Sequence, residues 1–253
     1  MQTDDVTVVI NGQSRDLWEG YEIDSDLLVP ADGWRVNLGG ISTVLPDAVA
    51  PGAAVQVLIG GDVVLSGLLD DVEEVITNDE EYVYLTGRDA AAVLLDCSAP
   101  IFTAQNIDLP SIVAKIVKPL GITNVVIAGA TDQKFDRVEV EPGETAWDAL
   151  AHACESAGLW PWMMPDGSLY IGAADYSAPP VATLILNESG FGNNIISMRR
   201  RRSLARRYSD VSILGQAHGS GASDGAPALL AKAIDADVPV YRPLIVIDAE
   251  AVT

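Results

Sequence analysis

The chain has 253 residues, 49% of them hydrophobic, and its 36 acidic side chains outnumber 15 lysines and arginines to give a formal net charge of −21. Such a charge repels nucleic acid, which excludes DNA binding over the whole surface but permits a local basic contact or an acidic channel. Two cysteines and two histidines without metal-ligand spacing, and the lack of a long apolar run, argue against a zinc site, a disulfide framework and a transmembrane helix.

The first part of the chain, residues 1–97, is predicted to be a small β domain. Residues 6–10 are β-branched and precede Asn11–Gly12, the strongest two-residue hairpin signal. A second hairpin is expected where residues 55–59 meet Gly60–Gly61, and Gly67 within the returning strand suggests a bend. Short strands at this spacing are typical of a barrel or sandwich.

Residues 98–178 change from strand to helix periodicity. A short helix is expected at 89–97, at the end of the first part, and further helices are expected at 110–122 and 145–158, with a strand at 124–128. Thr145 and Asp148 have the spacing of a capping box. Residues 159–172 predict a hairpin, and the pattern as a whole predicts an α+β module inserted between two β-rich parts.

Residues 179–253 return to strands, which are predicted at 181–186, 208–215 and 239–248. A long mobile loop is expected at the Gly- and Ser-rich start of residues 218–237. The chain stops at Thr253 just after a strand, so we expect this last β domain to be incomplete or to need a partner.

The sequence contains no recognisable catalytic frame. Asp70–Asp71 and Glu73–Glu74 are adjacent acids, but close pairs are expected in a chain with 36 acids. His152 is interpreted as a helix surface residue, and Cys97 and Cys154 as buried free thiols. Trp160 and Trp162 favour core or subunit packing over a sugar-binding platform. We therefore predict no catalytic residues, no metal site and no cofactor.

Six arginines fall within nine residues: Arg199, Arg200, Arg201, Arg202, Arg206 and Arg207. Residues 199–253 carry eight basic and six acidic side chains, whereas residues 1–198 carry seven basic and thirty acidic ones. Three interpretations of these arginines are open: a solvated charged face, a nucleic-acid contact or a protein contact. Arginine forks dock well on carboxylates, so a subunit interface is favoured. If these residues form a strand, alternate side chains could hold two partners.

The order of the motifs resembles that of the tail baseplate hub proteins of Mu-like phages, relatives of the hubs of contractile injection systems. The matching pieces are GWRVNLGGIS at 33–42, PGAAVQVLIGGDVVLSGLLDDVE at 51–73, YLTGRDAAAVLLDCSAP at 84–100, the helix and hairpin of residues 135–172, RRYSDVSILGQ at 206–216, and VYRPLIVID at 240–248. The resemblance covers nearly the whole chain, although the stretch between Trp34 and Gly52 is shorter than is usual in the family.

This resemblance implies a mainly β, α+β chain in which two tail-tube-like β-barrel domains flank a smaller α+β insertion. It implies a structural, non-enzymatic virion protein that is assembled in the host cytoplasm and located in the tail baseplate. Three copies would form a homotrimeric, pseudo-hexameric ring that joins the tail tube protein to a spike or central fibre protein among other baseplate proteins. Genomic DNA would pass through without specific binding, and the chain would not insert into a membrane.

Three rival functions remain as alternatives. The chain could be the hub of a secretion-type spike, although no repetitive β-helix sequence follows. It could be a tail-associated peptidoglycan hydrolase, or a DNA-binding protein that acts through residues 199–207.

Overall fold

The computed structural model describes residues 5–15, 18–39, 48–129, 134–174, 177–216 and 227–252. The chain divides into two compact units, residues 1–177 and residues 178–253. The described part of the chain is mainly β, as predicted, and its helices are confined to the middle of the sequence. No helix in that part is long and apolar enough to cross a membrane.

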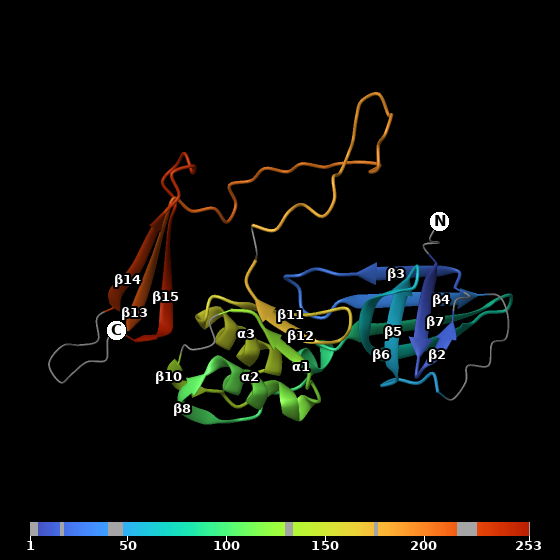
Figure 1. Ribbon diagram of the computed structural model, residues 1–253, viewed down its shortest axis with the longest axis horizontal. Coiled ribbons are helices and arrows are strands. Elements are labelled where there is room, and N and C mark those ends of the chain that lie inside the picture. Colours follow the sequence, from blue (N-terminus) through green and yellow to red (C-terminus); the bar gives the residue numbers. More distant parts are fainter. Residues whose placement is uncertain are drawn as a thin grey trace. The chain divides into compact units, whose positions relative to one another are not determined.

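The first unit begins with a curled, seven-stranded antiparallel sheet in the order β2-β1-β5-β6-β7-β4-β3 (Figure 1). Both predicted hairpins are present. Asn11 and Gly12 adopt the two positive φ angles, 47° and 78°, that a tight hairpin turn requires. The strands are β1 Val6–Ile10, β2 Gln13–Arg15, β3 Gly20–Asp24, β4 Gly33–Gly39, β5 Ala54–Ile59, β6 Asp62–Ile76 and β7 Glu81–Asp89.

Strand β6 gives this sheet its curl because it pairs with β5 along its first half and with β7 along its second. The two ladders overlap at Gly67, where a Cβ atom would lie 2.0 Å from the carbonyl oxygen of Arg88. The bend predicted at Gly67 is therefore a close backbone approach, followed by a register shift between Leu69 and Asp71. Alternate side chains from the strands form one buried cluster, among them the fully buried Val8, Val57 and Leu85.

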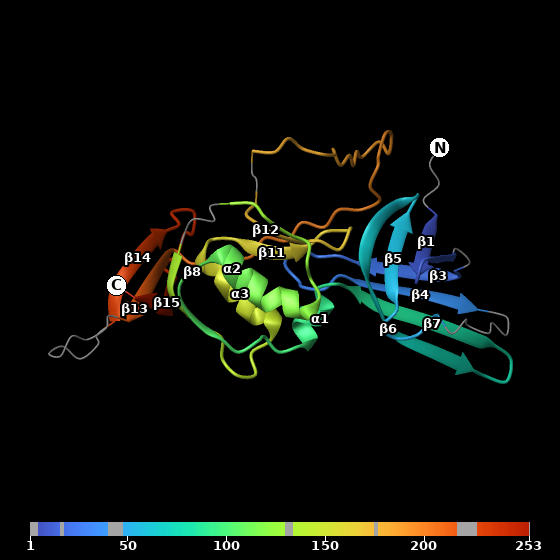
Figure 2. The same ribbon diagram turned by 60° about the horizontal axis from the view of Figure 1, so that its bottom comes forward.

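The rest of the first unit is an α+β module in which α2 and α3 lie side by side (Figure 2). Two small sheets accompany them: β10-β8 is antiparallel, and β11-β12-β9 contains a parallel β12–β9 pair. The elements are α1 Ala92–Asp96, β8 Thr103–Asp108, α2 Leu109–Val117, the 3-10 turn η1 Lys118–Leu120, β9 Val125–Ile127, β10 Lys134–Glu139, α3 Ala146–Ser156, β11 Trp160–Met163 and β12 Leu169–Gly172.

A second buried cluster forms between the helices and the β11-β12-β9 sheet. Its fully buried members include Ile116 on α2, Leu150 on α3 and Leu169 on β12. Thr145 begins α3 as predicted: its hydroxyl accepts the Asp148 N–H at 3.0 Å and donates to the Asp148 carboxylate at 2.7 Å. Cys154 on α3 is buried, as expected, whereas Cys97 is only half-buried.

The second unit contains a three-stranded sheet in the order β14-β13-β15, formed by β13 Asp210–Gln216, β14 Pro227–Ile234 and β15 Pro243–Val252. Strand β13 pairs antiparallel with β14 and parallel with β15. Strand β14 was not predicted, because its Ala-rich sequence has weak strand propensity and pairing with β13 decides its conformation. The start of the expected mobile loop, residues 218–226, lies outside the described residues.

The strand predicted at residues 181–186 is wrong. The described residues supply it with no β-ladder partner, and asparagine side chains bind its backbone instead. Asn194 accepts the Ile185 N–H at 2.7 Å and donates to the Thr183 carbonyl at 2.8 Å. A strand without a paired neighbour has no hydrogen-bonded ladder, so its β-branched composition is not sufficient.

Candidate functional site

The arginine segment, residues 199–207, lies in the second unit just before β13 (Figure 1). Arg199–Arg202 and Arg206 are exposed and belong to no helix or strand. The strand that would have pointed alternate arginines to opposite sides is therefore not formed. Within the described part of the chain, none of these five side chains takes part in an ion pair.

Arg207 differs from the other five because the fold holds it. Its guanidinium lies 2.7 Å from the carboxylate of Asp235, which raises the pKa of Arg207 and lowers that of Asp235 through their hydrogen bond. The Arg242 side chain also donates to the Arg207 carbonyl at 3.0 Å and lies 6.0 Å above the Tyr208 ring. Arg207 thus anchors one end of the arginine segment to the three-stranded sheet.

Large apolar side chains precede the arginines and are as exposed as the charges. Ile196 is 101% exposed, Met198 71% and Phe191 88%. An exposed Ile or Met is unremarkable alone, but a row of them beside unpaired arginines has the composition of a surface that another molecule covers. Only the charges of this segment stood out in the sequence.

A second charged surface lies on the first unit, at the far end of the hairpin formed by β6 and β7. Residues 70–81, here called the acidic hairpin, contain seven acidic and no basic residues. Asp70 is bound by Arg88 at 2.7 Å, whereas Asp71, Glu73, Glu74 and Asp79 are exposed and form no ion pair within the described residues. Two of these acid pairs were visible in the sequence, where they looked like chance neighbours.

The turn of the acidic hairpin is ordered by Thr77. Its hydroxyl donates to the Glu80 carbonyl at 2.9 Å and accepts the Glu80 N–H at 3.0 Å. The Thr77 N–H also donates to the Glu80 carbonyl, at 2.8 Å. Ile76, at the end of β6, is 74% exposed next to this turn. The hairpin therefore presents a rigid edge on which an apolar side chain sits among carboxylates.

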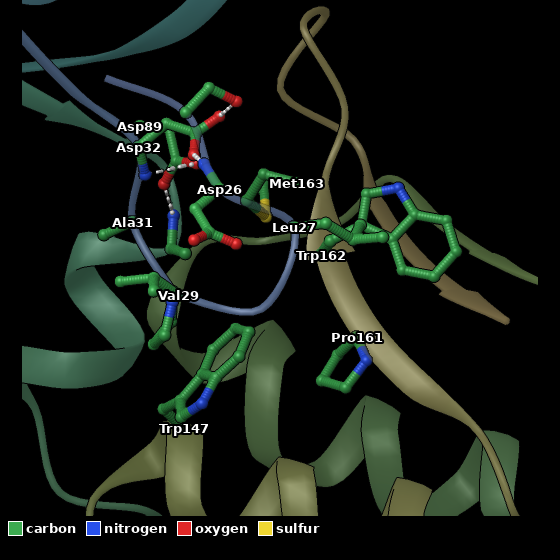
Figure 3. Close-up of a pocket in the computed structure, with 13 residues that line it drawn as sticks. Asp26, Leu27, Val29, Ala31, Asp32, Asp89, Trp147, Pro161, Trp162 and Met163 are labelled. Atoms are coloured by element: carbon green, nitrogen blue, oxygen red, sulfur yellow. Dashed lines mark hydrogen bonds between the residues drawn. The ribbon is translucent and has the colours of Figure 1, made fainter. Parts of the chain in front are cut away.

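The first unit also contains a pocket of about 120 Å³ between the 25–32 loop, the start of α3 and β11 (Figure 3). Asp89 is buried there and accepts the N–H groups of Ala91 at 2.7 Å and Asp32 at 3.2 Å. Burial raises the pKa of Asp89 to about 6, although the two hydrogen bonds oppose the shift. On the other side of the pocket, Figure 3 places Trp147 and Pro161.

The carboxylates of this pocket already accept hydrogen bonds from neighbouring residues. The Asp32 carboxylate accepts from the Ser25 hydroxyl at 2.6 Å and the Asp26 N–H at 3.1 Å. The Trp160 N–H binds the Leu27 carbonyl at 3.0 Å, which fixes the 25–32 loop to β11. These hydrogen bonds therefore indicate that the pocket residues have a structural role: they join the curled sheet to the α+β module.

The remaining candidates from the sequence are dispersed. His152 is 65% exposed and contacts Glu144 at 3.2 Å on the surface of α3. Trp160 packs edge-on against Trp147 with ring centres 6.3 Å apart, while Trp162 lies 4.6 Å from Tyr170. Among the residues that the structure describes, no group of three or more His, Cys, Asp or Glu side chains could hold a metal ion.

Three family models match successive parts of the chain. Residues 5–89 match the N-terminal domain of the Mu phage baseplate assembly protein GpP-like family, and residues 91–173 match the second domain of the baseplate hub protein gp44-like family. Residues 207–253 match the third domain of the tail protein NMB1110-like family.

Similar proteins of known sequence or structure agree with these matches. The baseplate hub protein gp44 of Escherichia phage Mu is 27% identical over 217 residues, which are 81% of this chain and 55% of that protein. The chain thus spans about half the length of this curated relative. A tail protein from Neisseria meningitidis MC58 is 33% identical, with a TM-score of 0.82 over 98% of this chain and 72% of that one. The 43 kDa tail protein of prophage MuSo2 from Shewanella oneidensis is 25% identical, with a TM-score of 0.80 over 98% and 73%.

Proposed function

We propose that this chain, which belongs to the family of Mu-like phage tail baseplate hub proteins, acts as a structural hub of a phage tail baseplate. The observation that carries this role is the order of the matches. A Mu baseplate domain, a gp44-like hub domain and a tail-protein domain follow one another along the sequence. The hub would reside in the virion tail and associate with the other proteins of the baseplate.

The proposed architecture has three parts: residues 1–97 as a first tube-like barrel, residues 98–178 as the α+β insertion and residues 179–253 as a second tube-like barrel. Two observations support it. The curled sheet and the α+β module have separate buried clusters, and the sheet of the second unit leaves large apolar side chains such as Ile245 and Ile247 exposed. A three-stranded sheet without a covered face is expected to gain stability from further strands or from a neighbour.

In the assembled baseplate, three copies would form a ring of six barrel domains between the tail tube and the spike or central fibre. The net charge of −21 suits this role, because an acidic bore repels the phosphates of passing DNA and avoids trapping the genome. The arginine segment would contact carboxylates of a neighbouring subunit. Its exposure and its unpaired side chains support this assignment.

Gold-labelled antibodies against the chain, applied to intact virions and viewed by electron microscopy, test the role directly. We expect label at the end of the tail that carries the baseplate. Label on the head, along the whole tail or absent from the particle would contradict a hub role. Imaging of the purified protein would then test the ring, for which we expect annular particles with threefold symmetry.

The rival enzymatic function is tested with the same purified protein. Clearing of peptidoglycan in a zymogram would favour a hydrolase over a purely structural hub. We expect no clearing, because the pocket of the first unit holds its acids in hydrogen bonds to neighbouring main-chain groups.

A further inference from the structure

We propose that the arginine segment of one copy docks on the acidic hairpin of a second copy. This inference rests on the proposed self-association of the hub and names the two surfaces that meet. The two surfaces are distinct patches on the same polypeptide, so the contact can repeat head-to-tail from one copy to the next. Head-to-tail contacts close into rings when the rotation between neighbours allows it.

The charges of the two surfaces are opposite in sign. The arginines without an ion pair are Arg199, Arg200, Arg201, Arg202 and Arg206, and the acids without one are Asp71, Glu73, Glu74, Asp79, Glu80 and Glu81, counted over the residues that the structure describes. Four consecutive arginines repel one another unless an opposite charge neutralises them. Carboxylates accept the arginine fork with two parallel hydrogen bonds, so the acids of the hairpin are strong partners for this segment, with Asp71 and Glu73 on one face and Glu74 and Glu81 on the other.

Apolar side chains lie beside the charges on both surfaces. Ile76 is 74% exposed at the end of β6, and Ile196 and Met198 are exposed just before the first arginine. Interfaces commonly bury an apolar centre within a polar and charged rim. The acidic hairpin and the arginine segment each supply both parts, which favours a protein contact over simple charge pairing in solvent.

The two surfaces also differ in how far regular structure holds them, and this difference suits docking. The acidic hairpin is held by the β6–β7 ladder and by the Thr77 turn, whereas residues 199–206 belong to no helix or strand. A segment without regular structure can follow a rigid surface and form many contacts along it, at the cost of ordering its side chains. The anchor at Arg207 limits that cost because one end is already fixed.

A second copy is the partner that the charges favour. Nucleic acid would have to approach a chain with a net charge of −21, and the nearest aromatic to the arginines, Tyr208, is partly buried beside Arg242. A second copy brings the acidic hairpin itself. The chain therefore carries both halves of the contact.

Charge reversal of the 253-residue chain tests the contact. One variant changes Arg199, Arg200, Arg201 and Arg202 to Glu; another changes Glu73, Glu74 and Asp79 to Arg. A control changes Asp136, Glu141 and Glu155 to Arg, three exposed acids outside the hairpin that form no ion pair within the described residues. Self-association is measured by sedimentation velocity, and circular dichroism confirms that each variant is folded.

We expect each reversed variant to associate about tenfold more weakly or worse, and the control to associate like the wild type. A one-to-one mixture of the two reversed variants should recover association in pairs, because each offers the surface that the other needs, whereas a ring of three copies cannot alternate the two variants. A chain that carries both sets of changes should associate like the wild type, because the reversed segment of one copy then meets the reversed hairpin of the next, and association as weak as in the single sets would overturn the proposal.

Unchanged association of either reversed variant would also overturn the proposal, as would a wild type that remains monomeric at every concentration tested. None of these results tests the hub role itself. That role is tested by the labelling of virions, whose outcome does not depend on which surfaces meet. A failure of the contact and a failure of the proposed function are thus separate outcomes.

Discussion

Arg207 donates a hydrogen bond of 2.7 Å to Asp235, and this pair separates one arginine that stabilises the fold from five that are free to bind elsewhere. The pair lies at the join between the arginine segment and the β14-β13-β15 sheet. The roles of the six arginines therefore differ, although they look equivalent in the sequence.

The first prediction compares Arg207→Ala with Arg200→Ala. Loss of Arg207 leaves the Asp235 carboxylate without its partner and should speed hydrogen exchange of the main-chain amides of β13 and β14. Loss of Arg200 should leave exchange unchanged, because that side chain is exposed and forms no ion pair within the described residues. Equal exchange in both variants would show that the pair does not support the sheet. Salt at about 1 M should reduce the difference by screening the pair.

The second prediction concerns the buried carboxyl of Asp89. Its pKa is raised from 3.8 to about 6, chiefly by burial, so the folded protein binds this proton more tightly than the unfolded chain does. The contribution of Asp89 is therefore most favourable below the unfolded pKa and is lost as the pH rises toward about 6. A shift of this size corresponds to about 3 kcal/mol in the free energy of unfolding.

Urea unfolding of the wild type and of Asp89→Asn at about pH 4 and about pH 7 measures this effect. The stability of the wild type relative to the variant should fall by up to about 3 kcal/mol between the lower and the higher pH. Carboxylates shared by both proteins cancel in the comparison. A difference that stays constant with pH would mean that Asp89 does not titrate in this interval.

The third prediction concerns Gly67, at the bend of β6. An alanine Cβ would lie 2.0 Å from the Arg88 carbonyl oxygen and 2.6 Å from the Asp89 Cα, so the two strands would have to separate. We expect Gly67→Ala to lower the free energy of unfolding by about 2–3 kcal/mol. Gly33→Ala is the matched control in the same sheet, because a Cβ at that position would have no heavy atom within 4 Å among the described residues. Chemical denaturation of both variants would detect the difference, and equal stabilities would refute the close approach.

The fourth prediction concerns the thiol of Cys154. Burial raises its pKa to about 12, so it stays protonated and shielded near neutral pH. In a Cys97→Ser variant, iodoacetamide should leave the folded protein unlabelled and modify Cys154 only after denaturation. Mass spectrometry measures the labelling. Rapid modification of the folded protein would show that α3 opens readily.

Local sequence signals predicted the elements whose contacts are close in the chain. The turn at Asn11–Gly12 and the start of α3 at Thr145 both depend on residues within a few positions of one another. The resemblance to the Mu-like hub family was also readable, because it depends on the order of such motifs along the sequence.

Predictions from the sequence were wrong or incomplete where the pairing partners of a strand are distant in the chain or missing among the described residues. Residues 181–186 have strand composition but no ladder partner within the described residues, while the Ala-rich β14 is a strand because β13 lies beside it. Likewise, the acids of residues 70–81 looked like chance pairs until β6 and β7 brought them to one end of a hairpin.

The sequence by itself determined the mainly β composition, the tight turns, the helix caps and the charge imbalance, since these depend on residue type and short spacing. Only the tertiary structure decided which arginine is tied to the fold, which acids stand unpaired among the described residues, and where β6 must bend around Gly67. The reason is that strand pairing, burial and ion pairs join residues far apart in the chain, and their free energy depends on neighbours that local preference does not specify.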